Sequence, residues 1–233
     1  MSYQEKHNTS LGTVYLIGEQ SRISADPRQS YEHALTYGAN RGEIAQLIVA
    51  GDHTMEGHKC VYGAKFDSPR AWDGAVVSSP RAAVVIQTAD CPSLILTHKK
   101  TGRAALVHAG RPALTGTCNV INNAVHAVLQ GYEGAADLEA LVVGAICGSC
   151  FKHDREEAKP LIEYFHRLPD YVFADKETGA LDLYEVIRHG LMYHGVKDEN
   201  IRRAGPCTFE TTGLSSYRRD RTALRNTVIM VLD

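Results

Sequence analysis

The chain has 233 residues, of which 44% are hydrophobic and 22% charged, the proportions of an ordinary globular protein able to bury a core without disulfide bonds. Its 25 basic and 27 acidic side chains nearly balance, so the net charge of −2 predicts no general attraction to nucleic acid or to an anionic membrane. The sequence has neither a secretory leader pattern nor an apolar run of about 18 residues, which favours a cytoplasmic protein with reduced cysteines.

Short apolar runs of strand length recur along the chain, separated by turn-rich segments. In chain order they are TVYLIG, IAQLIVAG, AVVSS, AAVVIQT, SLIL, RAALV, LEALVVGAI and TVIMVL. Helical periodicity covers about 118–130, with Thr117 as the expected N-cap, and recurs over 154–168 and 182–196. No linker or repeat divides the chain. We therefore predict one α+β domain with mixed sheets over residues 1–233.

A β-hairpin is predicted where SLIL and RAALV flank the polar turn HKKTG. If Leu96 pairs with Arg103, Cys91 lies directly opposite His108. Opposite residues in an antiparallel pair have Cβ atoms roughly 4.5–5.5 Å apart. The hairpin is thus expected to bring a thiolate and an imidazole together, where they could share one metal ion or one proton.

His53 is the third ligand-type side chain expected at a strand end, because it follows the run IAQLIVAG. Two imidazoles and one thiolate with an open fourth position form a known catalytic zinc arrangement. Two other interpretations remain at this point. Cys91 and His108 could be ordinary buried residues, or His108 could activate Cys91 as a nucleophile, with Asp90 or another polar group orienting the imidazole.

Two further segments carry groups of interest. Cys147-Gly148-Ser149-Cys150 has CxxC spacing, but no second CxxC exists, so a tight turn at a strand end is the favoured interpretation. The segment SSYRRDRTALRN contains Arg218 and Arg219, whose guanidinium groups suit phosphate or carboxylate recognition, although such a charge run is usually a solvated surface.

The segments TADC, VHAG and SYRR, taken together, resemble the YfiH-type family of laccase-domain proteins, described as polyphenol oxidoreductases, purine nucleoside phosphorylases and peptidoglycan editing factors. The resemblance implies a layered α/β/β/α fold and places metal ligands at His53, Cys91 and His108. It also implies zinc-dependent phosphorolysis of adenosine, inosine and methylthioadenosine, with adenosine deamination as a side activity. The implied partners are a purine nucleoside and phosphate, the latter expected near Arg111, Arg218 and Arg219.

Two segments depart from the family pattern. HAGRPA stands where the family usually reads HAGWRG, and the glycine-rich N-terminal segment is not recognisable. These departures predict a retained metal centre in an altered pocket. Competing hypotheses are a copper-dependent polyphenol oxidase (laccase), an amide hydrolase that edits peptidoglycan precursors through Cys91, and a non-enzymatic family member. Neither the oligomeric state nor the choice between zinc and copper follows from the sequence.

Overall fold

The computed structural model describes residues 3–18, 27–41, 43–47, 60–62, 73–115, 119–221 and 223–233. Its five-stranded sheet has the order β1-β2-β13-β6-β3. These strands are β1 Gln4–Asn8, β2 Gly12–Ile17, β13 Asn226–Leu232, β6 Ala83–Thr88 and β3 Ile44–Leu47. The six-stranded sheet has the order β12-β9-β7-β8-β5-β4. Its strands are β12 Ile201–Arg203, β9 Glu139–Val143, β7 Ser93–His98, β8 Arg103–His108, β5 Gly74–Val77 and β4 Cys60–Tyr62.

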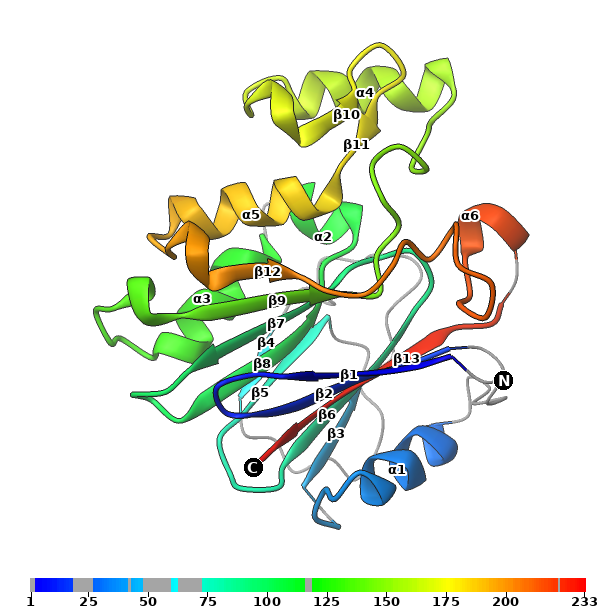
Figure 1. Ribbon diagram of the computed structural model, residues 1–233. Coiled ribbons are helices and arrows are strands. Elements are labelled where there is room, and N and C mark those ends of the chain that lie inside the picture. The colour runs from blue at the N-terminus through cyan, green and yellow to red at the C-terminus, as the bar shows by residue number, and fades with distance from the viewer. Residues whose placement is uncertain are drawn as a thin grey trace.

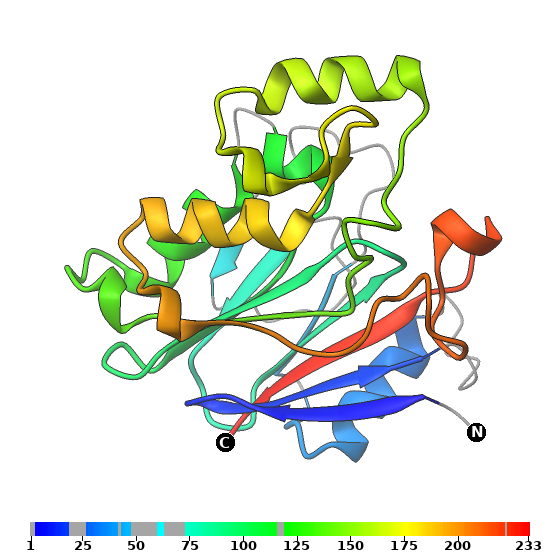
Figure 2. The same ribbon diagram turned by 45° about the horizontal axis from the view of Figure 1, so that its top comes forward.

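Helices cover the outer faces of both sheets (Figure 1). Helix α1 Pro27–Thr36 packs on the five-stranded sheet, and α3 Val120–Leu129 and α5 Leu183–Tyr193 pack on the six-stranded sheet. The other helices are α2 Arg111–Thr115, α4 Arg155–Phe165 and α6 Tyr217–Asp220. The small hairpin of β10 Phe173–Asp175 and β11 Ala180–Leu181 lies beside α4 (Figure 2). Short 3₁₀ turns occur at Ala135–Asp137, Asp170–Val172 and Asp198–Asn200.

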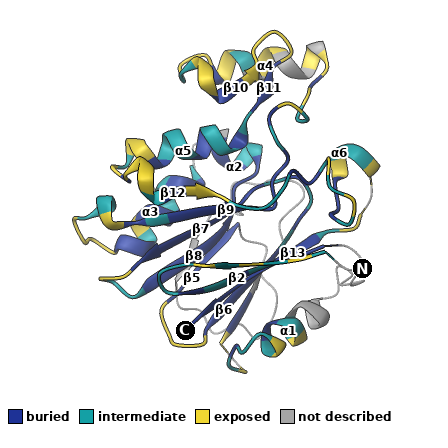
Figure 3. Cartoon of the chain, in the orientation of Figure 1, coloured by how far each residue is buried: buried dark blue, intermediate teal, exposed yellow. Residues whose placement is uncertain are grey.

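The two sheets pack face to face and helices pack on their outer faces, so the fold contains three apolar layers. A central core joins residues of both sheets, including Leu16, Ile86 and Leu106. An outer core lies between the six-stranded sheet and the helices α3 and α5, and a smaller one lies beneath α1. Buried residues accordingly concentrate on the strands and the inner helix faces (Figure 3). The predicted layered α/β/β/α fold with mixed sheets is confirmed.

The strands β7 and β8 are buried along their whole length, because the six-stranded sheet is covered on both faces. Along β7, Ile95 faces the other sheet, whereas Leu94 and Leu96 face the helices. This double burial explains why SLIL is a continuous apolar run instead of an alternating one.

The predicted register of this hairpin is wrong by two residues. Ser93, not Cys91, lies opposite His108, and His98 pairs with Arg103. The strand continues through Thr97 and His98, which the predicted pairing of Leu96 with Arg103 would leave in the turn. Both polar side chains have hydrogen-bond partners within the fold. Thr97 Oγ1 lies 2.9 Å from Ser10 Oγ, and His98 Nδ1 lies 3.1 Å from Thr101 Oγ1. A shift of two residues keeps every side chain on its expected face.

The N-terminus of α3 also differs from the expectation. Asn119 is the cap, because its Oδ1 accepts hydrogen bonds from the backbone N–H groups of Ile121 and Asn122 at 2.9 and 3.4 Å. Thr117 lies outside the described residues. Among the helices of the described ranges, none combines the length and the apolar character needed to cross a lipid bilayer.

Candidate active site

His108 is the last residue of β8, and two contacts with Asp73 fix its position. The Nδ1 atom of His108 lies 2.9 Å from Asp73 Oδ1, and its backbone N–H donates to the Asp73 carbonyl oxygen at 2.6 Å. Both side chains are at most 3% exposed. In this contact the Nδ1–H of His108 donates to the Asp73 carboxylate, so the Nε2 atom on the opposite edge of the ring points away from Asp73.

Cys91 reaches the same place from the turn between β6 and β7. Asp90 has a left-handed backbone (φ 78°), which turns the chain after β6, and Cys91 and Pro92 then lead into β7. The hydrogen bond from Ala109 N to Pro92 O, 2.8 Å, continues the pairing past His108. Cys91 therefore meets His108 although the two residues are not directly opposite in the ladder.

Gly110 borders the point that Cys91 and His108 share. A Cβ atom placed on Gly110 would lie 2.7 Å from His108 Nε2 and 3.1 Å from Cys91 Sγ. The imidazole nitrogen and the thiol sulfur thus face one small space, which any other residue at this position would fill. Cys91 itself is partly exposed, so the space lies at the sheet edge.

The electrostatics of His108 reflect competing effects. Complete burial by itself would lower the pKa of the imidazole, but the Cys91 thiolate and the hydrogen bond to Asp73 outweigh burial and raise the pKa to about 9. A metal ion that bound the Nε2 atom of His108 would have to displace a proton from it.

Of the expected orienting groups, Asp73 and not Asp90 contacts the imidazole. The Asp90 carboxylate instead accepts from Thr208 Oγ1 at 2.7 Å and from the Arg218 backbone N–H at 2.6 Å. Asp90 thereby joins the turn that carries Cys91 to the C-terminal segment. The orienting carboxylate, Asp73, precedes β5, and sequence spacing could not identify it because 35 residues separate it from His108.

The remaining predicted site residues have different surroundings. His53 lies outside the described residues. Arg111 is the first residue of α2, three positions after His108, and is partly exposed. The Arg218 guanidinium lies 3.4 Å from His153 Nδ1 and 5.1 Å from the centre of the Phe151 ring.

Arg219 has a structural role in this conformation. Its guanidinium donates to the Asp220 carboxylate and to four backbone carbonyl groups, those of Thr208, Phe209, Thr211 and Leu214. These bonds engage all five N–H groups of the side chain. Arg219 thus shapes this loop, and its expected contact with substrate stays a prediction.

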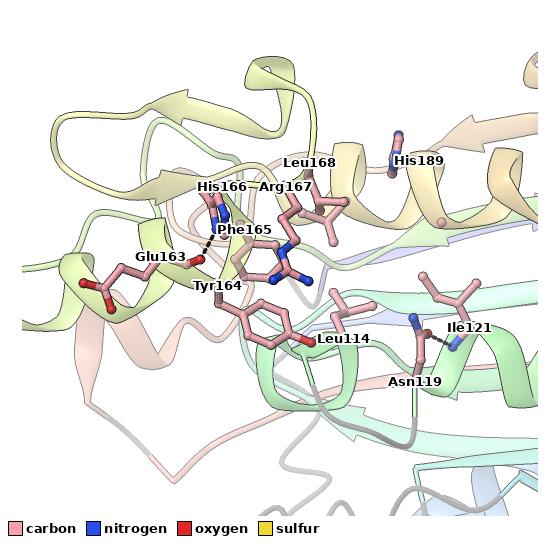
Figure 4. Close-up of a pocket in the computed structure, with 12 residues that line it drawn as sticks. Leu114, Asn119, Ile121, Glu163, Tyr164, Phe165, His166, Arg167, Leu168 and His189 are labelled. Atoms are coloured by element: carbon pink, nitrogen blue, oxygen red, sulfur yellow. Dashed lines mark hydrogen bonds between the residues drawn. The ribbon is translucent and has the colours of Figure 1, made fainter.

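A separate cavity of about 490 Å³ opens among the helices (Figure 4). Its walls come from α2, α3, α4 and α5 and the residues that follow α4, and include Leu114, Tyr164, Arg167 and His189. None of Asp73, Cys91 and His108 lines it. The case for chemistry at the thiol and imidazole consequently depends on their donor atoms and not on this cavity.

Comparison with known proteins identifies the family of this chain. Residues 28–232 match the family described as multi-copper polyphenol oxidoreductase laccase. A purine nucleoside phosphorylase of Streptomyces coelicolor is 34% identical over 68% of this chain and 64% of its own length, and one of Streptomyces griseus is 31% identical over 70% and 64%. The matched region thus spans less than two thirds of these relatives. A protein of an unknown prokaryote named adenosine deaminase RL5 is 28% identical over 63% of the chain and 56% of its own length.

Solved structures share the same fold. YfiH of Bacillus licheniformis superposes with a TM-score of 0.77 at 18% identity, covering 95% of this chain and 92% of that one. NMB0706 of Neisseria meningitidis gives the same score and identity over 99% of both chains. With the family match, these findings show that the chain belongs to the YfiH-type family of laccase-domain proteins.

Proposed function

We propose that this protein is a zinc-dependent purine nucleoside phosphorylase with adenosine deaminase activity as a side reaction. The observation that carries the proposal is the arrangement around Gly110, where Cys91 Sγ and His108 Nε2 face one space while Asp73 holds the far side of the imidazole. Relatives named purine nucleoside phosphorylase and adenosine deaminase support the choice of reaction. A cytoplasmic location remains part of this proposal.

The residues fit a zinc ion. A thiolate and an imidazole are preferred zinc ligands, and a metal-binding histidine typically donates its other N–H to a carboxylate, as His108 does to Asp73. Cys91, His108 and His53 would hold the ion, and the fourth position would accept phosphate or water. When bound, zinc would bring phosphate or water into nucleophilic form and polarise the group under attack.

The protein's own groups would then position the reactants. In phosphorolysis a phosphate oxygen bonds to the ribose C1′ carbon, and the purine leaves with the electron pair of the broken glycosidic bond. We assign Arg111 to the phosphate, because it begins α2 close to His108 in the chain. Arg218 is the second candidate, since its backbone N–H is bound by Asp90 next to Cys91. In deamination, water takes the place of phosphate and attacks the ring carbon that carries the amino group, which leaves as ammonia.

The test combines metal analysis with assays of wild type and Cys91→Ala. We expect Cys91→Ala to lose one zinc equivalent relative to wild type, and phosphorolysis of inosine to fall by about 100-fold or more. Asp73→Asn should show a smaller loss of both zinc affinity and rate, because the ligands stay but the orienting charge is gone.

Three results would contradict the proposal. Copper-dependent oxygen consumption with a phenol, and no nucleoside turnover, would identify the oxidase that the family description suggests. Chelator-resistant activity on peptidoglycan precursors, abolished by a thiol reagent, would identify the Cys91-dependent hydrolase. Full activity of Cys91→Ala on inosine would show that this site does not take part in the reaction.

A further inference from the structure

A second group of metal-binding side chains lies apart from Cys91 and His108. Cys147 and Cys150 follow β9, and Cys207 and Glu210 follow β12. One ligand atom of each residue lies within 4.8 Å of all the others, and the three cysteines are free thiols. Cys207 is buried, Cys147 and Cys150 are partly exposed, and Glu210 is exposed. We refer to these four residues as the cysteine cluster.

The topology of the sheet explains why these distant residues meet. The strands β9 and β12 are parallel neighbours, with Ile201 paired to Ala140 and Arg203 to Val142. Both strands therefore end at the same edge of the sheet, and their following segments run on together (Figure 1). Backbone bonds extend this pairing, since Ala204 N donates to Val142 O at 2.9 Å and Thr208 N to Ala145 O at 3.2 Å.

Hydrogen bonds already connect the members of the cysteine cluster. The Cys147 backbone N–H donates to Cys207 Sγ at 3.2 Å, and Cys150 Sγ donates to a Glu210 carboxylate oxygen at 3.4 Å. The turn Cys147–Cys150 is also closely packed against residues outside the cluster. A Cβ atom on Gly148 would lie 2.7 Å from Ala174 Cβ and 2.9 Å from Asp182 Cβ, so only glycine fits there. The CxxC segment is thus a tight turn, as expected, and its two sulfur atoms face the partners after β12.

We propose that Cys147, Cys150, Cys207 and Glu210 form a structural zinc site, distinct from the candidate active site. Four donors complete the tetrahedral coordination of zinc and leave no open position, which is the pattern of structural sites. Zn–S bonds of about 2.3 Å place two sulfur atoms roughly 3.8 Å apart, so the observed limit of 4.8 Å needs only a small contraction. Soft thiolates favour zinc over magnesium or calcium.

The site would fix the segment that supports Cys91. Thr208 directly follows Cys207 and donates to Asp90, while Ile146, next to Cys147, donates from its backbone N–H to the Asp90 carbonyl oxygen at 3.0 Å. An ion in the cysteine cluster would therefore clamp both segments that bind Asp90. Its role is to position residues and not to take part in the reaction.

The experiment uses a Cys91→Ser background, so that the two sites are measured separately. We expect Cys91→Ser to retain about one tightly bound zinc per chain, and Cys91→Ser/Cys150→Ser to retain none. Glu210→Gln in the same background should weaken zinc affinity by about 10- to 100-fold. Glu133→Gln, which alters an exposed glutamate far along the chain, is the matched control and should bind as its parent does.

Cobalt provides a readout that is independent of activity and of folding yield. Cobalt(II) bound in the Cys91→Ser protein should show strong thiolate-to-metal charge-transfer absorption in the near ultraviolet, which weakens with each cysteine of the cluster replaced by serine. Either of two outcomes would overturn the proposal. One is no retained zinc and no such absorption in Cys91→Ser. The other is a mass decrease of two hydrogens, showing that two of the thiols form a disulfide in the protein as purified.

Discussion

At the scale of single residues, two residues besides Cys91 and His108 define the candidate active site, the carboxylate of Asp73 and the glycine at position 110. Asp73 binds one nitrogen of His108, and Gly110 leaves open the space that the other nitrogen shares with Cys91. Neither role can be read from local pattern. Asp73 precedes a different strand, and a glycine after a strand usually signals only a turn. The sequence predicts that Cys91 and His108 meet, because Cys91 precedes the first strand of one predicted hairpin and His108 follows the second.

We predict that Gly110→Ala weakens zinc binding and phosphorolysis by at least about 10-fold, and that the displacement of the buried imidazole also lowers the thermal stability. The added methyl group would lie 2.7 Å from the imidazole and 3.1 Å from the sulfur, and would occupy the shared space without replacing a ligand. Zinc competition titration and inosine assays measure the effect. Gly134→Ala is the control, because its methyl group meets only the Tyr132 side chain. Unchanged zinc affinity in Gly110→Ala would show that the ion does not bind there.

At the scale of elements, the turn after β6 links the hairpin to the C-terminal segment. Asp90 adopts a left-handed backbone and accepts one side-chain and two backbone hydrogen bonds from residues after β9 and β12. The apolar pattern predicts the hairpin itself but not its register, because the polar residues Thr97 and His98 are buried in the strand. The strand β1 has no apolar pattern, since its sequence QEKHN lies at the edge of its sheet.

We expect Asp90→Ala to lower the free energy of unfolding by about 3 kcal/mol, since it leaves the Thr208 hydroxyl and the Arg218 N–H without their carboxylate. Asp90→Gly should recover roughly 1 kcal/mol of this loss, because glycine adopts the left-handed backbone without strain. Urea denaturation provides the measurement. Asp137→Ala, which removes an exposed ion pair with Lys100, should have a much smaller effect. Equal losses at the two positions would disprove the linking role of Asp90.

At the scale of the whole molecule, the six-stranded sheet belongs to two cores at once. Its strands contribute alternate residues to the layer between the sheets and to the layer under the helices. The continuous apolar runs predicted buried strands in mixed sheets, whereas the layered α/β/β/α arrangement was expected from the family resemblance alone. The cysteine cluster was not predicted, since its two halves come from separate segments that only the parallel pairing of β9 and β12 brings together.

Replacing Ile95 or Leu96 with alanine tests whether the two cores unfold together. Both side chains are at most 1% exposed but face opposite layers, so each substitution should cost about 2–5 kcal/mol. Because both residues lie on one strand, we expect each variant to retain a single unfolding transition, with coincident near- and far-ultraviolet circular dichroism curves. Two separate transitions in either variant would show that the layers are independent.

The double burial of β7 and β8 has a consequence for engineering new specificity. Strands held on both faces form a rigid frame, so directed evolution has little freedom to move the sulfur and nitrogen donors at their ends. Substitutions that alter substrate preference should instead accumulate in the surrounding connections, beginning with Arg111 and Pro112, which open α2 directly after Gly110. Libraries restricted to those connections would explore new substrates while leaving the donor atoms in place.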